Sequence, residues 1–347
     1  MRSTFKGIKR NKAPGPDNIS PSVLHHCAAE LAGVFTNIFN SSLCQSSVPN
    51  CFKESIIIPV PKTKTISCLN DYRPIALTSA VMKSFECIIL NHLKSVTNPL
   101  MDPYQFSYRA NSSVEDTVIL ATHHILNHLE SANTYARILF MDFSSAFNTI
   151  NPAKLFNTLL DMNIDPCICH WIHSILWNRQ QKVKIKNTTS SPLFLSTGTP
   201  QGCVLSPWLF SLYTNKLTSH HSSVNLYKYA DDSTIIGLIT NNQETEYRAQ
   251  INQAVTWCTD HDLILNSSKT TELIIDPRRQ PSPKTPVLIK GESISITDTF
   301  KLLGTHISNN LKWKINADHI YKKAQQRLFH LRQLKKFRVR SRVKKRQ

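Results

Sequence analysis

Residues 225–237 read NLYKYADDSTIIG and place two adjacent carboxylates between two apolar runs. Residues 224–229 alternate with the two-residue period of a β-strand, and Ser233–Ile239 is typical of a second strand. Asp231 and Asp232 therefore fall at the turn of a hairpin. A turn accommodates Asp readily, because the side chain can hydrogen-bond local backbone amides. Apolar strands on both sides, however, predict a buried hairpin tip, where paired carboxylates repel and require a divalent cation with oxygen ligands.

A metal site needs a further carboxylate, and residues 137–148, RILFMDFSSAFN, supply one. An apolar strand ends there in Asp142, and small residues then turn the chain. Asp142, Asp231 and Asp232 can hold two divalent cations about 3.5–4 Å apart, as in-line phosphoryl transfer requires. A metal-dependent nuclease would also cluster carboxylates, but it needs neither a nucleotide clamp nor an aromatic residue beside the first Asp.

Three basic residues elsewhere in the sequence suggest how the phosphates of a substrate are bound. Lys62 and Arg73 each lie beside a proline-stiffened strand. We interpret them as a phosphate clamp, because Arg binds phosphate bidentately, with ordinary solvated charges as the alternative. Lys269, at the start of a strand, is placed to donate a proton to pyrophosphate.

A loop rich in Gly and Pro, TGTPQGCVLSP at residues 197–207, opens a helix that is expected to reach about Leu217. Gly202 permits a close approach of the backbone to another group. A loop that enters a helix N-terminus suits a nucleotide or phosphate, although this pattern alone is not specific.

The other elements follow from local patterns. Ser55–Val60 predicts an edge strand, Lys182–Lys186 a strand with a basic solvent-facing edge, and Phe300–Ile307 a further strand. Pro277–Pro286 is the best candidate for a domain boundary or a surface insertion. Helices are expected at residues 21–39, 77–93, 113–129 and 244–258, and in the basic tail to about Leu334.

Composition limits the function classes. With 347 residues the chain is long enough for two or three lobes and a substantial core. The formal net charge of +18 points to a polyanionic partner, nucleic acid before membrane, and the excess concentrates from Lys312 onward. No run of about eighteen apolar residues occurs, so no membrane span is expected.

The nine cysteines show no pairing pattern. Cys167, Cys169, His170 and His173 suggest zinc, but C-x-C is not the usual ligand spacing. Apolar residues recur there at helical spacing, which favours buried or half-buried thiols. The odd cysteine number and the lack of a signal peptide indicate an intracellular protein of the cytoplasm, the nucleus or both.

Taken in order, the motifs closely resemble the reverse transcriptases of non-LTR (LINE-type) retrotransposons. The resemblance runs from residue 11 to about 335. It is carried by the Asp142 motif with Ala146 and Phe147, and by KAPGPD (12–17), IPVPK (58–62), DYRPI (71–75), TPQGCVLSP (199–207), YADD (229–232), NSSKT (266–270) and FKLLG (300–304).

The resemblance implies an α+β right-hand polymerase with an antiparallel palm sheet. Residues 1–135 would form the fingers with the first palm elements, 136–310 the palm, and 311–347 the basic start of a truncated thumb. Asp142, Asp231 and Asp232 would be the metal-binding carboxylates, with Asp232 the least direct. The remaining roles would be nucleotide binding by Lys62, Arg73, Phe143, Phe147 (also the steric gate against a 2′-hydroxyl), Gln201 and Gly202, catalysis by Lys269, and a primer grip at Leu303 and Gly304.

Three departures from the family pattern stand out. Asn148 replaces a frequent Asp near the metals. Ser107, Ala110 and Asn111 replace glycines and a Lys in the segment that contacts template. The chain also ends in what should be the early thumb, without an N-terminal endonuclease or a Cys/His knuckle.

The expected activity is RNA-directed DNA synthesis by two-metal phosphoryl transfer. The expected cofactor is two Mg²⁺ ions, with Mn²⁺ as a substitute. The expected partners are an RNA template, a DNA primer and deoxynucleoside triphosphates. The alternative is a relic that binds nucleic acid without extending a primer.

Overall fold

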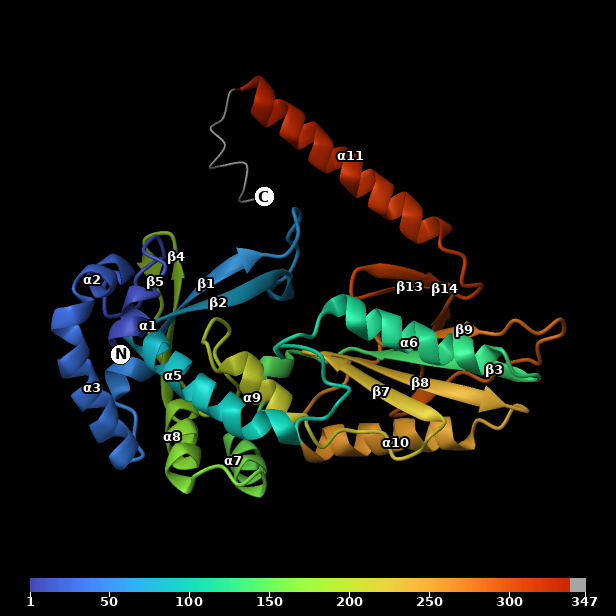
Figure 1. Cartoon of the computed structure of the whole chain (residues 1–347), viewed down its shortest axis with the longest axis horizontal. Helices are drawn as coiled ribbons and strands as arrows, with labels where there is room; N and C mark the ends of the chain where they lie inside the picture. Colours follow the sequence, from blue (N-terminus) through green and yellow to red (C-terminus); the bar gives the residue numbers. More distant parts are fainter. Residues whose placement is uncertain (338–347) are drawn as a thin grey trace.

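The computed structural model describes residues 1–337 and confirms a mixed α+β fold. Two five-stranded sheets lie in separate lobes, one covered by long helices and the other flanked by a helical cluster (Figure 1). The predicted basic segment 311–347 is described only as far as residue 337, and its last ten residues lie outside the described part.

The first sheet, here called the carboxylate sheet, has the strand order β12-β9-β3-β8-β7. Its central strand β3 is buried along its whole length. Every pairing is antiparallel except that of β12 with β9. The strands are β3 (Thr134–Met141), β7 (Val224–Tyr229), β8 (Asp232–Thr240), β9 (Thr271–Ile275) and β12 (Ser295–Thr297).

Helices cover both faces of the carboxylate sheet, as the alternation of β3 requires. Ile138 and Phe140 share a buried cluster with Val118 of α6 (Val114–Leu129). Leu139 belongs instead to the cluster that contains Ile251 of α10 (Thr245–Asp260). The sheet is therefore covered on both faces, and one end of its strands faces the other lobe (Figure 1).

The second sheet has the order β2-β1-β4-β5, with β6 also paired to β4. The predicted edge strand at Ser55–Val60 is wrong, because β1 lies between β2 and β4. Only Ser55–Ile57 of β1 pair with β4. Beyond Ile57 the side of β1 that faces away from β2 has no partner strand, so the lack of a backbone N–H at Pro59 and Pro61 costs no hydrogen bond there. The strands are β1 (Ser55–Pro61), β2 (Tyr72–Thr78), β4 (Arg179–Ile185), β5 (Thr188–Thr189) and β6 (Leu193–Leu195).

Short helices pack around the second sheet. The single helix expected at residues 21–39 is two helices, because Cys27 leaves helical geometry at φ −93° and ψ 28°. The expected helix to Leu217 ends earlier, at Tyr213. The helices are α1 (Arg2–Lys6), α2 (Pro21–His26), α3 (Ala28–Cys44), α4 (Asn50–Lys53), α5 (Ala80–Thr97), α7 (Pro152–Asp161), α8 (Pro166–Leu176) and α9 (Ser206–Tyr213), with 3₁₀ turns η1 (Leu69–Asp71), η2 (Asn98–Leu100) and η3 (Ala146–Asn148).

The segment Pro277–Pro286 is a surface insertion rather than a boundary, because the chain returns through β12 to the carboxylate sheet. It is fixed in place by Arg278 and Lys284, whose cationic groups lie 4.6 and 3.4 Å from the ring centre of Tyr135. The small hairpin β10 (Leu288–Ile289) and β11 (Glu292–Ser293) follows it.

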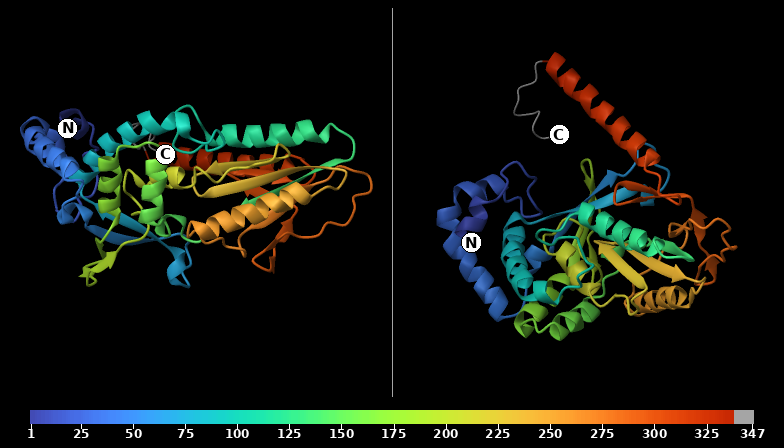
Figure 2. Two further views of the ribbon diagram at one scale, coloured as in Figure 1. Left: turned by 90° about the horizontal axis from the view of Figure 1, so that it is seen from below. Right: turned by 45° about the vertical axis from the view of Figure 1, so that its right-hand side comes forward.

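The last described helix, α11 (Lys314–Lys336), projects away from both lobes (Figures 1 and 2). None of its residues is buried. Within residues 1–337, no helix combines the length and apolar character that crossing a membrane needs.

All nine cysteines are free. Cys169 is buried in α8, as expected from the helical spacing there, whereas Cys167 is exposed.

Candidate active site

The two adjacent carboxylates lie where the sequence places them, at the tip of the β7–β8 hairpin. Tyr229 pairs with Asp232, so Ala230 and Asp231 form the two-residue turn. Ala230 has a φ of 57°, a left-handed conformation that disfavours a residue with a Cβ. Such strained residues persist where the surroundings hold them, and they cluster at functional sites.

The segment between α5 and α6, which runs beside β7, holds this turn. Ser107 accepts a hydrogen bond of 2.7 Å from the backbone N–H of Ala230, and its own hydroxyl donates to Gln105 Oε1 at 2.8 Å. The flanking chain pairs with β7, since Phe106 N donates to Lys228 O at 3.0 Å. In the sequence Ser107 stands out only as a departure from the family pattern, and no sequence signal indicates its contact with the turn.

Asp142 lies beside Asp232 because β3 and β8 are neighbours. Met141 pairs with Ser233, so the next residue of β3 comes level with Asp232. Burial raises the pKa of Asp142, and so does the charge of Asp231, whereas Lys269 lowers it. Burial followed by the charges of Asp231 and Asp142 raises the pKa of Asp232 to about 6. The three carboxylates therefore repel one another across a shared space.

The chemistry of this group fits a divalent cation with oxygen ligands. Among residues 1–337, however, no three His, Cys, Asp or Glu side chains are grouped closely enough to hold an ion on their own. Mg²⁺ commonly takes one or two carboxylates together with substrate phosphates and waters rather than a full protein cage. A divalent ion at these aspartates would therefore need further oxygen ligands from substrate phosphates and water.

Lys269 is carried to Asp142 by a segment that runs beside it. Asn266 N donates to Asp142 O at 2.9 Å, and Asp142 N donates to Thr270 Oγ1 at 3.3 Å. Thr270 is fully buried, and its hydroxyl donates to Asn266 O at 2.8 Å. Thr270 therefore anchors the turn that presents Lys269, a role that its place in the NSSKT motif does not reveal.

The residues near Leu303 form a hairpin rather than the single strand expected at Phe300–Ile307. β13 (Thr299–Leu302) and β14 (Thr305–Ser308) pair, and the turn between them has φ values of 48° at Leu303 and 100° at Gly304. Positive φ at both positions is the geometry of a tight hairpin turn. Leu303 lines a cavity together with Asp142, Asp232 and Lys269, so this hairpin lies against the carboxylates.

The loop at residues 197–205 connects the two lobes. Gly198 N donates to Ile150 O and Thr199 N to Phe147 O, each at 2.7 Å, just after the Asp142 motif. On its other side, Ala76 N of β2 donates to Gln201 O at 2.7 Å. Gly202 has a φ of 121°, and a Cβ there would lie 2.7 Å from Ala76 O, so this close approach requires glycine.

Two predicted site residues lie farther out on the second sheet. Arg73 pairs with Val60 near the tip of the β1–β2 hairpin, and Lys62 N bonds Asp71 O at 2.8 Å beside it. Both side chains are exposed. They lie on the same hairpin that receives Gln201, whereas the three aspartates lie on the carboxylate sheet.

The two predicted phenylalanines differ in their environments. Phe143 is buried in the main core and bridges to Leu265, so its ring is not presented to solvent at the site. Phe147 is half-buried, with its ring centre 5.0 Å from that of Phe210. Of the two, Phe147 is the ring that can meet a ligand.

The chain matches a known protein family. Residues 60–307 match the family described as reverse transcriptase (RNA-dependent DNA polymerase), and the chain belongs to that family. A second, short match, to the N-terminal region of alkylated DNA repair protein alkB homolog 8, covers residues 313–343.

Individual relatives identify the branch of the family. The chain is 25% identical over 95% of its length to "Probable RNA-directed DNA polymerase from transposon BS" of Drosophila melanogaster, covering 38% of that protein. It is also 25% identical over 92% of its length to "RNA-directed DNA polymerase from mobile element jockey" of the same species, covering 36% of it. A type-2 retrotransposable element polyprotein, R2DM, is 24% identical over 94% of the chain and is covered to 32%.

These matches confirm the prediction of a reverse transcriptase domain of the non-LTR retrotransposon type. The chain spans a little over a third of the length of the first two relatives.

Proposed function

We propose that the chain is an RNA-directed DNA polymerase, which adds deoxynucleotides to the 3′ end of a DNA primer on an RNA template. The observation that carries this proposal is the group of Asp142, Asp231 and Asp232, in which burial and the charge of Asp231 raise the pKa of Asp142, and burial and the charges of the other two raise that of Asp232. Beside this group lie a hairpin turn at Leu303 and a loop at Gln201 and Gly202 that requires glycine. A polymerase needs two surfaces next to its carboxylates, one for the primer and one for the incoming nucleotide.

In this proposal the fold is a right hand. The carboxylate sheet is the palm, within residues 136–310. The second sheet and its helices are the fingers, mainly residues 1–135, joined in space by β4–β6 from the later segment. α11, in the segment from residue 311, belongs to the thumb.

The aspartates would hold Mg²⁺, or Mn²⁺ in its place, with Asp142 and Asp231 more direct than Asp232. When bound, a pair of such ions lowers the pKa of an attacking hydroxyl and neutralises the charge on the leaving pyrophosphate. Lys269, whose charge already acts on Asp142, would donate a proton to the leaving group.

Other side chains would bind and orient the substrates. Arg73 and Lys62 would clamp the triphosphate from the β1–β2 hairpin. Phe147 would limit the space beside the sugar, while Gln201 and Gly202 would lie against the nucleotide and template. Leu303 and Gly304 would hold the primer end. The net charge of +18 would draw the template–primer to the protein, and binding should weaken about 10³–10⁵-fold between 50 and 200 mM salt.

Primer extension on RNA and DNA templates tests the proposal. The chain should incorporate deoxynucleotides in a Mg²⁺-dependent manner, and Asp142→Asn or Asp231→Asn should abolish incorporation while the circular dichroism spectrum stays unchanged. Asp161→Asn is a matched control, because Asp161 is an exposed carboxylate whose ion pair with Lys216 lies outside the site. Extension by either site variant would refute the assignment, and template binding without extension by the unmodified chain would favour a non-catalytic nucleic-acid-binding role.

A further inference from the structure

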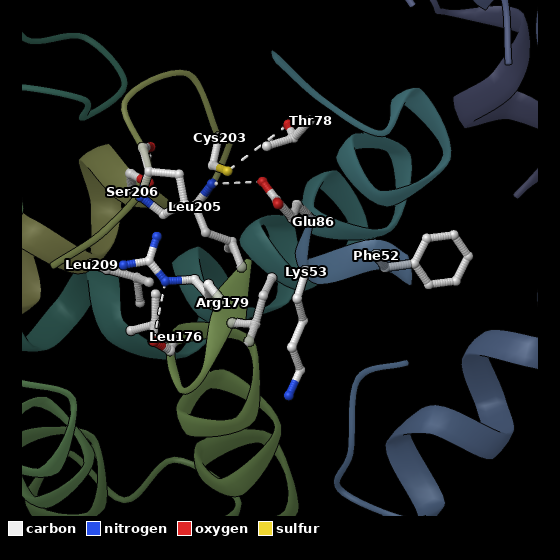
Figure 3. A pocket seen from close by; sticks show the side chains of 12 residues that line it. Phe52, Lys53, Thr78, Glu86, Leu176, Arg179, Cys203, Leu205, Ser206 and Leu209 are labelled. Atoms are coloured by element: carbon white, nitrogen blue, oxygen red, sulfur yellow. Dashed lines mark hydrogen bonds between the residues drawn. The ribbon is translucent and has the colours of Figure 1, made fainter. Parts of the chain in front are cut away.

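A buried acid from another helix contacts the end of the loop that carries Gln201 and Gly202. Glu86 of α5 is 1% exposed. Its Oε2 accepts hydrogen bonds from Val204 N at 2.6 Å and Leu205 N at 3.3 Å. Figure 3 shows Glu86 beside Leu205. Burial raises the pKa of Glu86, while these two amides and Lys83 lower it.

These two amides belong to the two residues just before α9, and the helix has no side-chain cap of its own. Leu205 is its N-cap residue and makes no side-chain capping bond. The first N–H groups of a helix lack partners within the helix. A carboxylate supplied by α5 therefore satisfies two backbone amides that follow Gly202 by only two and three residues.

A buried base holds the other end of the same loop. Arg179 at the start of β4 is buried, and its Nη2 donates to Thr197 O and to Gly198 O, the latter at 2.9 Å. Glu86 and Arg179 line one cavity beneath the loop, together with Cys203 and Ser206 (Figure 3). The loop is thus held by an acid on its amides and by a base on its carbonyls.

The exposed middle of the loop has contacts that depend on these ends. Ser206 Oγ donates to Pro200 O at 2.8 Å, which closes the turn over Gln201 and Gly202. Ala76 N then reaches Gln201 O. If either buried charge were lost, a backbone group inside the protein would lose its partner, and the loop would move relative to β2.

We propose that Glu86 and Arg179 are positioning residues that fix the loop Thr197–Leu205, and thereby set how tightly Gln201 and Gly202 hold the incoming nucleotide. This proposal rests on the polymerase function proposed above. Both side chains are buried and bind the backbone of the loop, so the effect is expected on nucleotide binding and not on the metal-dependent step.

Four variants of the full chain separate charge, hydrogen bonding and packing. In Glu86→Ala both amides lose their acceptor. In Glu86→Gln one amide oxygen can still accept both bonds, because both go to Oε2. Thr97→Val is the matched control: Thr97 is a buried α5 residue that accepts a bond from Trp208 of α9 at 3.2 Å, away from the loop. Arg179→Met tests the second residue.

The first measurement is hydrogen exchange at the amides of Val204 and Leu205, which does not depend on activity. Exchange should accelerate at least about tenfold in Glu86→Ala, return close to the unmodified rate in Glu86→Gln and stay unchanged in Thr97→Val. Unchanged exchange in Glu86→Ala would overturn the proposal, whether or not the chain polymerises.

The second measurement is steady-state incorporation. In Glu86→Ala and Arg179→Met the KM for deoxynucleoside triphosphate should rise about tenfold with kcat within about threefold, and Glu86→Gln should recover most of the loss. If kcat fell by as much as KM rose, or if Thr97→Val showed the same change in KM, both residues would act through packing alone and the proposal would be overturned. If the unmodified chain incorporates nothing, the polymerase function fails, and the exchange rates alone decide whether Glu86 holds the loop.

Discussion

The hydroxyl of Ser107 accepts a 2.7 Å hydrogen bond from the backbone N–H of Ala230, the residue before Asp231. This bond joins two segments more than a hundred residues apart in sequence. It acts on a turn whose first residue has a positive φ, so it holds in place a conformation that the local sequence does not favour.

Ser107→Ala should therefore loosen the carboxylate turn. We expect a loss of about 1 kcal/mol in the free energy of unfolding, typical for one removed hydrogen bond, with a fall in kcat at nearly constant KM for nucleotide. Denaturant titration and steady-state kinetics measure the two effects. Ser211→Ala is the control, because Ser211 is equally buried but bonds only within its own helix. A similar fall in kcat for both variants would mean that the contact with Ala230 has no special role.

The metal-free protein should lose stability as pH rises through the range in which Asp232 ionises. Its folded-state pKa of about 6 is above the ordinary value of 3.8, so the protonated form favours folding. That contribution is complete below about pH 4 and lost above about pH 6. The melting temperature of Asp232→Asn minus that of the unmodified protein should therefore increase over this interval. Parallel melting curves from pH 4 to 7 would contradict the pKa shift.

Added Mg²⁺ should reverse that trend. Above pH 6 Asp232 loses its proton, and its charge then adds to the repulsion among the carboxylates, so a bound cation should raise the melting temperature more at pH 7.5 than at pH 5. Asp142→Asn should lose most of this Mg²⁺ effect, and Asp161→Asn should retain it. An equal Mg²⁺ effect at both pH values would argue against binding at these carboxylates.

Gly202→Ala should displace the loop from β2. The new Cβ would lie 2.7 Å from Ala76 O at a φ of 121°, so both backbone strain and a clash oppose it. We expect a raised KM for nucleotide and a lower melting temperature. Gly291→Ala is the matched control, because Gly291 has a φ of 83° with no atom within 4 Å of the added Cβ. If both variants lose the same amount, strain alone explains the result and the contact with Ala76 is unimportant.

Phe147→Ala should increase incorporation of ribonucleotides relative to deoxynucleotides. The ring is half-buried against Phe210, and its backbone oxygen holds Thr199, so truncation opens space without releasing the loop. Competition between the two nucleotide types in primer extension measures the ratio. Phe156→Ala, a half-buried phenylalanine of α7 against His170, controls for general loosening. An unchanged ratio would place the sugar selectivity elsewhere.

The strands of the carboxylate sheet could be predicted from sequence because their signals are local. The alternation at residues 224–229 and the apolar run before Asp142 each specify a strand, and the Asp231–Asp232 pair specifies the turn. The hairpin at Leu303 was missed, because a turn through Leu303 and Gly304 needs positive φ at a leucine, which the sequence alone does not suggest. β1 was taken for an edge strand because its prolines fit an edge, and its parallel partner β4 lies more than a hundred residues away.

The supporting contacts of the site could not be predicted, since each joins distant segments. Ser107 and Glu86 belong to no chemical motif, and Thr270 has no chemical role of its own within NSSKT; the importance of all three lies in which backbone amides they reach. Periodicity identifies which face of a helix is buried, but not that a buried Glu will meet the start of a helix on another part of the chain.

The helix α11 has consequences for how the chain unfolds. It has no buried residue and contacts β14 near its start, where Asn316 and His319 lie against His306. The rest of its 23 residues therefore gain little from tertiary packing and follow the helix–coil behaviour of a free peptide. Heating should therefore produce a gradual loss of ellipticity from this segment beneath the single sigmoidal transition of the packed lobes. A calorimetric enthalpy per residue, calculated over the whole chain, would then fall below that of a protein in which every element melts together.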